Sequence, residues 1–434
     1  MFKAKKIEKK DSLKPLSLRK NISWTFMGNI IYAGCQWGML VVLAKLGSPE
    51  MVGRFALALA ITAPVMMLTN LQLRGVQATD TKELYQFGDY LGLRLITSML
   101  AFFIVAVVVL LTNRVLETIF VVLIMCMAKI IESISDIVFG LMQKNECMDR
   151  IAMSMIFKGV ISLLVLGIVV WITSSLVVGT LALALVWFAV LVFYDVKNAQ
   201  RFTTFRPIIH YPAIKSMVKL SLPLGIVLMM GSLNTNIPRY FIEFYIDEET
   251  LGYFAAMAYL IVAGNSVISA LGQSATPKLA KYYAYGNRKS FEKLILKMVG
   301  IGIIMGVIGL GVAIIFGNEL LTLLYSEDYA KYSDVFVLVM LAGAINYAGS
   351  FLGYGMTAAR CFKIQPFLGS IWVISSLVVS FLLIPSYGMR GAAYVLIVSS
   401  CVQLVTKTLV VVYLIYIRKA DNYVIKNSVC NLIF

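Results

Sequence analysis

Long apolar stretches fill almost the whole chain, and short polar segments separate them. A hydrocarbon core of roughly 30 Å needs about 20 mostly apolar residues for each helical crossing. The stretches are continuous, whereas the strands of a membrane barrel would alternate apolar and polar residues with period two. The pattern therefore predicts an all-α, polytopic membrane protein with about twelve transmembrane helices, at 21–45, 53–75, 90–112, 117–141, 151–173, 176–197, 214–236, 250–275, 293–317, 331–356, 364–384 and 390–417.

The crossings divide into two halves of six, and a short internal repeat supports this division. Pro49–Ala56 opens the second crossing as Pro-Glu-Met-Val-Gly-Arg-Phe-Ala, and Glu248–Ala255 opens the eighth as Glu-Glu-Thr-Leu-Gly-Tyr-Phe-Ala. Because six is even, both halves have the same orientation, and a parallel pseudo-twofold repeat is expected. The predicted parts are a cytoplasmic basic arm (1–20), an N-terminal six-helix lobe (21–197), a cytoplasmic linker (198–213), a C-terminal six-helix lobe (214–417) and a cytoplasmic tail (418–434).

The charge of the chain matters through its distribution. The 434 residues are 60% hydrophobic and 14% charged, and the net charge is +16, which in a soluble protein would suggest nucleic acid. Here 26 of the 38 Lys and Arg residues fall in the segments on the side of the termini and 6 on the opposite side. This positive-inside asymmetry predicts that both termini are cytoplasmic and explains the charge without nucleic acid. The basic arm is expected to contact anionic membrane lipids.

Charged side chains inside the predicted crossings are the strongest indication of a site, because each costs about 2.5–3.5 kcal/mol at mid-span. Crossing four carries Lys129, Glu132 and Asp136, which share one stripe of a helix with 3.6 residues per turn. Crossing five carries Lys158 at a depth similar to that of Asp136, so these two could form an ion pair. Either the charges are interior ion pairs that fix helix register, or the lysines line a hydrated cavity for an anionic substrate. In the second case the carboxylates would tune the lysines or carry a coupling ion.

Other polar residues are weaker candidates for the same cavity. Arg54 and Arg239 lie near the outer ends of crossings two and seven, and Arg74 lies near the inner end of crossing two. Any of them could hold a phosphate, although interfacial arginines often only extend to the headgroups. Asn29 and Gln36 share a face of crossing one, where amides could bind sugar hydroxyls or simply join helices.

Little in the sequence indicates catalysis, a metal or a cofactor. The chain has one histidine, His210, and neither a Gly-rich phosphate loop nor a metal-ligand cluster is evident. Lys407 in crossing twelve has no partner that the sequence identifies. We therefore expect a protein that is not an enzyme and uses neither metal nor cofactor.

Five diffuse signatures carry a resemblance that covers about residues 17–417. They are Phe55–Pro64, Asn70–Asp80, Gln273–Ala280, Leu320–Ala330 and Tyr387–Ala393. With these segments the chain resembles the polysaccharide repeat-unit (O-antigen, capsule or exopolysaccharide) flippases of the multidrug/oligosaccharidyl-lipid/polysaccharide exporter superfamily.

The resemblance implies two six-helix lobes around a cavity that opens alternately to each side of a bacterial cell membrane. It implies a polyprenyl-diphosphate-linked oligosaccharide as the substrate, which moves from the inner to the outer leaflet. It also implies that crossings four and five help to wall the cavity, which suits Lys129 and Lys158. Polysaccharide polymerase and glycosyltransferases would be the expected protein partners.

Two alternatives remain open. A proton- or sodium-coupled multidrug exporter of the same superfamily could use Glu132 and Asp136, although crossing one has Asn29 and Gln36 and no carboxylate of the kind that some exporters use. A membrane polysaccharide polymerase is the alternative from another class. It would need a larger outer loop than the longest one predicted, at about 237–249.

Overall fold

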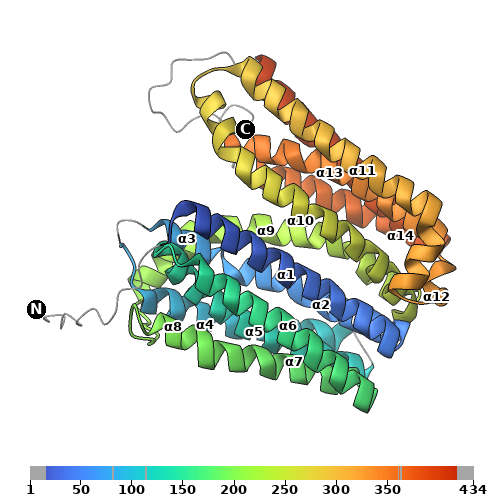
Figure 1. Ribbon diagram of the computed structural model, residues 1–434, viewed down its shortest axis with the longest axis horizontal. Helices are drawn as coiled ribbons and strands as arrows, with labels where there is room; N and C mark the ends of the chain where they lie inside the picture. Colours follow the sequence, from blue (N-terminus) through green and yellow to red (C-terminus); the bar gives the residue numbers. More distant parts are fainter. Residues whose placement is uncertain (1–15, 81–82, 113–114, 360, 362–363, 418–434) are drawn as a thin grey trace, which may run out of the picture. The chain divides into compact units, whose positions relative to one another are not determined.

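The computed structural model describes residues 16–80, 83–112, 115–359, 361 and 364–417. The predicted basic arm up to residue 15 and the tail from residue 418 lie outside these residues. Every element in the described part is a helix (Figure 1). The predicted all-α class is therefore confirmed.

The helices follow one another along the chain with short connections. Their bounds are α1 Leu18–Leu46, α2 Pro49–Asn70, α3 Leu73–Thr79, α4 Phe87–Thr112, α5 Leu116–Lys144, α6 Met148–Thr173, α7 Leu176–Val190, the π-helix η1 Leu191–Val196, α8 Lys197–Ala199, α9 Tyr211–Tyr245, α10 Glu248–Ala284, α11 Arg288–Leu324, α12 Glu327–Ala330, α13 Ser333–Ala358, α14 Gln365–Val412 and the π-helix η2 Tyr413–Ile417.

Eleven helical segments in the described residues are long and apolar enough to cross a membrane. The last of them, Gln365–Tyr416, has 52 residues, which is more than twice the length that a bilayer needs. Gly388 interrupts it with a positive φ of 58°, a conformation that glycine adopts without a steric penalty. Trp372 Nε1 donates a hydrogen bond to Thr406 Oγ1 at 3.0 Å, so the chain folds back on itself at Gly388. This segment thus holds the two crossings predicted at 364–384 and 390–417.

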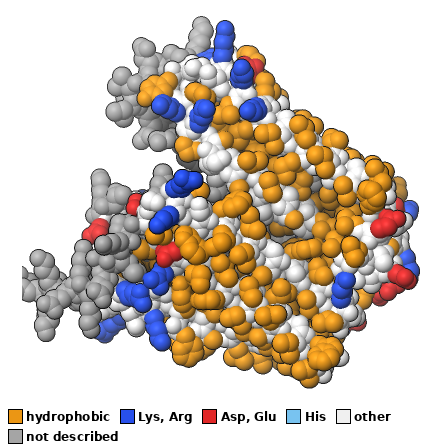
Figure 2. All heavy atoms as spheres, in the orientation of Figure 1, with side chains coloured by type: hydrophobic (Ala, Val, Ile, Leu, Met, Phe, Trp, Pro, Cys, Tyr) orange, Lys and Arg blue, Asp and Glu red, His pale blue; other side chains and the backbone are white. Residues whose placement is uncertain are grey.

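The surface explains why so apolar a chain folds into helices. Figure 2 shows hydrophobic side chains along the middle of the helices and most of the Lys and Arg side chains toward helix ends. Exposed Leu110, Trp171 and Phe381, for example, lie on three different crossings. Backbone groups in hydrocarbon must bond within their own segment, so helices with apolar exteriors satisfy both requirements.

The described helices group into two compact units. The first unit spans Met1–Met39 and Ile61–Met229, and the second spans Leu40–Ala60 and Met230–Phe434. In the second unit α11, α13 and α14 lie side by side, whereas α5, α6 and α7 pack together in the first (Figure 1). The lobe boundaries that the sequence suggested at 198–213 stay a prediction.

The two copies of the internal repeat meet in the second unit through a pair of glycines. A Cβ atom on Gly53 would overlap the carbonyl oxygen of Glu248, and one on Gly252 would overlap the carbonyl oxygen of Pro49. Pro49 corresponds to Glu248 in the repeat, so the contact is reciprocal, as a local twofold axis requires. The starts of α2 and α10 can pack this closely only because both positions lack a side chain.

Candidate functional site

A cavity of about 590 Å³ lies within the first unit. Its lining comes from α1, α2, α3, α5, α6 and α9, and α5 supplies the most polar side chains. The charged lining residues are Arg74, Lys129, Glu132, Asp136 and Lys158. All five were candidates from the sequence, and the fold brings them together.

One face of α5, which carries the predicted polar stripe, lines this cavity. Lys129, Glu132, Asp136, Phe139 and Gln143 follow one another at intervals of three or four residues and all line the cavity. That spacing places them on one face of a helix. The predicted stripe therefore faces a cavity rather than lipid, which lowers the cost of its charges.

Lys129 and Glu132 form the first charged group of the stripe. Lys129 Nζ lies 2.9 Å from Glu132 Oε2 and 5.0 Å from the centre of the Trp187 ring. Tyr32 of α1 donates its hydroxyl to Glu132 Oε1 at 2.5 Å. The side chain of Lys129 is 24% exposed, so its ammonium is paired but remains accessible from the cavity.

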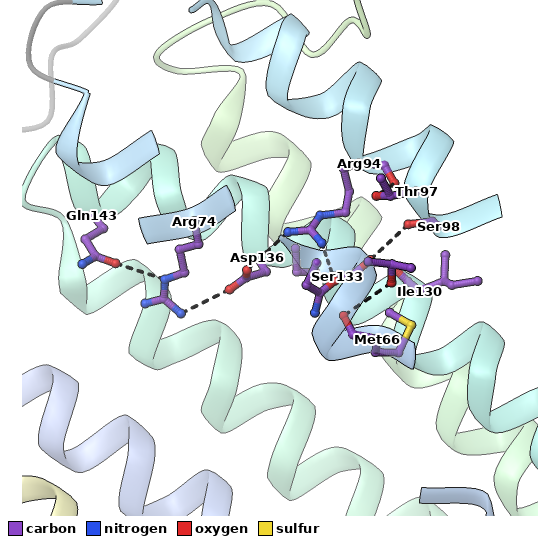
Figure 3. Close-up of polar contacts among 12 residues, drawn as sticks. Met66, Arg74, Arg94, Thr97, Ser98, Ile130, Ser133, Asp136 and Gln143 are labelled. Carbon is purple, nitrogen blue, oxygen red and sulfur yellow. Dashed lines mark hydrogen bonds and ion pairs between the residues drawn. The ribbon is translucent and has the colours of Figure 1, made fainter. Parts of the chain in front are cut away.

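Asp136 is the centre of the second group, which Figure 3 shows. Its carboxylate lies 3.4 Å from Nη1 of Arg74 and 3.7 Å from Nη2 of Arg94. The Arg94 side chain is only 1% exposed and Nη1 also donates to Asn70 Oδ1. Arg94 was missed in the sequence analysis, although a charge inside the apolar third crossing was itself a signal.

A break in the chain carries Arg74 to this position. Leu71 and Gln72 adopt positive φ values of 51° and 50°, so α2 ends and the short α3 begins in a new direction. A Cβ atom on Gly140 of α5 would lie 3.3 Å from the Cα atom of Arg74 and would overlap the side chain of Gln77. The absence of a side chain at Gly140 thus allows α3 to approach α5 closely.

Lys158 belongs to a third charged group, which is almost fully buried in the cavity wall, and its partner differs from the expected one. Its ammonium donates to Asp195 Oδ2 at 2.9 Å and to Ser135 Oγ at 2.5 Å, and it lies 5.1 Å from the centre of the Phe139 ring. The lysine and aspartate side chains are 2% and 0% exposed. The expected Lys158–Asp136 pair is therefore wrong. Asp195, which was also missed, belongs to the π-helix η1, a local widening often found at functional sites.

The remaining candidates do not line this cavity. Asn29 is exposed on α1, and Gln36 Nε2 is buried and finds no hydrogen-bond partner among the described residues. Arg54 pairs with Glu50 and, at 2.7 Å, with Glu248 in the second unit.

Two further cations also lie in the second unit. Arg239 donates to Asn236 Oδ1 at 3.2 Å and faces the Tyr259 ring. Lys407 is buried and donates to Gln403 Oε1 at 3.1 Å, with the Trp372 ring 4.9 Å away. Neither contact adds to the cavity of the first unit.

The charges of the cavity and its walls suit an anionic ligand. Arg74, Arg94, Lys129 and Lys158 are four cations, and Glu132, Asp136 and Asp195 are three carboxylates, so one positive charge is in excess. No cluster of His, Cys, Asp and Glu that could hold a metal ion occurs in the part of the chain that the structure describes. Anion binding by Arg and Lys is the chemistry that this arrangement offers.

Comparison with known proteins identifies the family. A sequence model of the family described as "Polysaccharide biosynthesis protein" matches residues 18–283. The chain is also 31% identical over 392 residues to "Capsular polysaccharide biosynthesis protein CapF" of Staphylococcus aureus, with 89% of this chain and 97% of that protein covered. The chain belongs to the polysaccharide biosynthesis protein family. The resemblance seen in the sequence is thereby confirmed.

Solved structures of membrane transporters share the fold of this polysaccharide biosynthesis protein. The structure titled "Lipid II flippase MurJ, inward closed conformation" matches with a TM-score of 0.69 at 13% identity, over 91% of this chain and 87% of that one. An inward-facing multidrug resistance MATE family transporter of the MOP superfamily matches with a TM-score of 0.58 at 12% identity, over 92% and 96%. The polysaccharide biosynthesis protein thus has the fold of these membrane transporters and is itself a multi-pass membrane protein.

Proposed function

We propose that this protein flips polyprenyl-diphosphate-linked oligosaccharide repeat units from the inner to the outer leaflet of a bacterial cell membrane, by alternating access. The observation that carries the proposal is the cavity of about 590 Å³ with partly exposed Arg74 and Lys129 on its wall. Membership of a polysaccharide biosynthesis family supports the substrate class. Both termini would lie in the cytoplasm, in keeping with the positive-inside asymmetry.

The physical requirement of this reaction matches such a cavity. Sugar hydroxyls cannot enter hydrocarbon without hydrogen-bond partners, so the headgroup needs a polar path while the lipid tail stays in the bilayer. The diphosphate needs cations. Arg74 and Lys129 provide two that are partly exposed, and the buried Lys158 in the cavity wall adds a third positive charge. An inside-negative potential favours outward movement of each negative charge by about 2.3 kcal/mol per 100 mV. Movement without a coupling ion is therefore energetically feasible.

The alternative functions receive less support. A proton- or sodium-coupled exporter would rely on Glu132 and Asp136, yet both carboxylates already contact cations, and α1 contains no acidic residue. A polymerase would need a folded outer segment, whereas α9 and α10 are separated only by residues 246 and 247. We do not assign Asn29, Gln36, Arg54 or Arg239 a substrate contact.

Replacement of Lys129 tests the proposal. Lys129→Ala should abolish polymer export and leave lipid-linked repeat units on the inner leaflet, because the accessible ammonium of the cavity is lost. The measurement is export in cells whose own copy of the gene is deleted, together with the leaflet distribution of the repeat unit. Lys331→Ala is the matched control, since Lys331 is exposed and pairs with Asp328, three residues earlier in the chain. Normal export by Lys129→Ala at normal expression would remove Lys129 from the mechanism.

A further inference from the structure

The carboxylate of Asp136 lies between two arginines that differ sharply in burial. The Arg94 side chain is 1% exposed, whereas that of Arg74 is 31% exposed. A guanidinium that is buried away from water depends on a nearby negative charge. An arginine that is one-third exposed can change its partner at little cost. The two ion pairs of Asp136 are therefore unequal.

Arg94 depends on Asp136 because its other contacts are few. Nη1 donates to Asn70 Oδ1, but Nε and Nη2 have no hydrogen-bond partner within the described residues. Asp136 Oδ2, at 3.7 Å from Nη2, supplies the compensating charge. Arg94 is not among the residues that line the cavity. It contacts two lining residues, Asp136 and Asn70, and of these only Asp136 carries a charge.

Arg74 has contacts that would survive the loss of Asp136. Its Nε donates to Gln143 Oε1 at 3.0 Å, and its guanidinium carbon lies 5.5 Å from the centre of the Phe139 ring. Its bond to Asp136 Oδ1 is longer, at 3.4 Å. Figure 3 shows Arg74 between Gln143 and Asp136. Gln143 and Phe139 both line the cavity, so they can hold Arg74 in place while its terminal nitrogens turn toward a ligand.

We propose that Asp136 competes with the phosphate groups of the substrate for binding to Arg74. In the empty cavity Asp136 holds Arg74, and in the loaded cavity a phosphate oxygen takes its place on Arg74 while Arg94 holds the carboxylate in position. A guanidinium suits this exchange, because it binds carboxylate and phosphate with the same pair of parallel donors. Arg94 and Asp136 are thus positioning residues that set the affinity for the diphosphate. The inference rests on the proposed function.

The first experiment measures binding of inorganic pyrophosphate to the full-length protein in detergent by calorimetry. Asp136→Asn should bind about tenfold more tightly than the wild type, a coupling within the range for contacting charged residues. Arg94→Gln should bind more weakly, because Asp136 is then left entirely to Arg74. The double variant Arg94→Gln/Asp136→Asn removes both charges of the pair and keeps the test open if Asp136→Asn alone does not fold.

The double variant also separates partner exchange from a simple effect of net charge. It leaves the net charge of the cavity region unchanged, so an effect of net charge alone predicts wild-type affinity. Partner exchange predicts binding about tenfold tighter than wild type, because Arg74 has lost its competitor. Wild-type affinity of the double variant would overturn the inference.

Glu132→Gln provides a matched control. Glu132 is the other cavity carboxylate, with a side chain 29% exposed against 30% for Asp136, but it holds Lys129 instead of Arg74. In an Arg74→Ala background the gain from Asp136→Asn should disappear, whereas any gain from Glu132→Gln should remain. A gain from Asp136→Asn that persists without Arg74 contradicts the exchange.

The same measurements with a polyprenyl diphosphate in the micelle distinguish the source of the phosphate. Arg74-dependent binding of the lipid is expected, and binding of pyrophosphate without binding of the lipid would overturn the lipid-linked assignment. If neither compound binds the wild type or any variant, the proposed function itself fails. If the wild type binds both and Asp136→Asn leaves the affinity unchanged, only the partner exchange fails.

Discussion

Asp195→Asn should destabilise the first unit strongly, because it leaves the ammonium of Lys158 buried without its counter-ion. The two side chains are 2% and 0% exposed, and their charged atoms are 2.9 Å apart. Removing one partner of a buried ion pair typically costs about 3–5 kcal/mol. Ser135 Oγ, at 2.5 Å from the ammonium, is neutral and can offset only part of that cost.

The assay is thermal unfolding of the purified protein in detergent, followed by the fluorescence of a thiol- or environment-sensitive dye. An apparent Tm lower by about 5–10 °C is expected from a loss of this size. Lys331→Ala again serves as the control. The Lys331–Asp328 pair is 2.7 Å long but exposed to solvent, which screens it, so its loss should leave the Tm unchanged.

A second variant checks the reasoning. Lys158→Met/Asp195→Leu removes both charges and keeps similar side-chain volumes, and such replacements of buried pairs are often neutral or stabilising. The double variant should therefore recover most of the Tm that Asp195→Asn loses. A double variant that is no more stable than Asp195→Asn would refute the idea that an uncompensated charge causes the loss, as would a wild-type Tm for Asp195→Asn.

Two other changes have clear expected outcomes. Gly53→Ala and Gly252→Ala should each reduce the yield of folded protein, measured by size-exclusion chromatography, because the added Cβ would overlap a backbone carbonyl oxygen. Gly34→Ala should behave as wild type, because a Cβ there would meet no atom within 4 Å. Equal yields for all three variants would contradict the close contact of α2 with α10. Lys407→Met should keep export and leave the Tm unchanged or slightly higher, because the buried ammonium contacts an amide and an indole ring rather than a carboxylate in the described residues; loss of export at normal expression would instead give Lys407 a role in transport.

The sequence predicted the polar stripe of α5 because one helix has a fixed angular period. Lys129, Glu132 and Asp136 needed only 3.6 residues per turn to be placed on a common face. The same reasoning could not give the partner of Lys158, since depth in the membrane says nothing about how α6 is rotated toward α5. Asp195 lies in a π-helix. A π-helix has more residues per turn than an α-helix, so the direction of the Asp195 side chain could not be worked out from an α-helical period.

Other parts of the site lay beyond local patterns. Arg74 reaches Asp136 through a break at two residues with positive φ, Leu71 and Gln72, and neither is a residue type that announces such a break. Arg94 was recognisable as a charge in an apolar crossing, but its function depends on Asp136, 42 positions further along the chain. Long-range pairings of this kind come from tertiary packing, which a single sequence does not reveal.

The reciprocal contact of Gly53 with Glu248 and of Gly252 with Pro49 has an evolutionary consequence. A chain of half the present length would carry this segment once and could dock it on an identical neighbour, glycine against helix start, as in a symmetric homodimer. Gene duplication and fusion would then have covalently joined an interface that already existed. Such an origin would account for the glycine that Pro-Glu-Met-Val-Gly and Glu-Glu-Thr-Leu-Gly share at the same position.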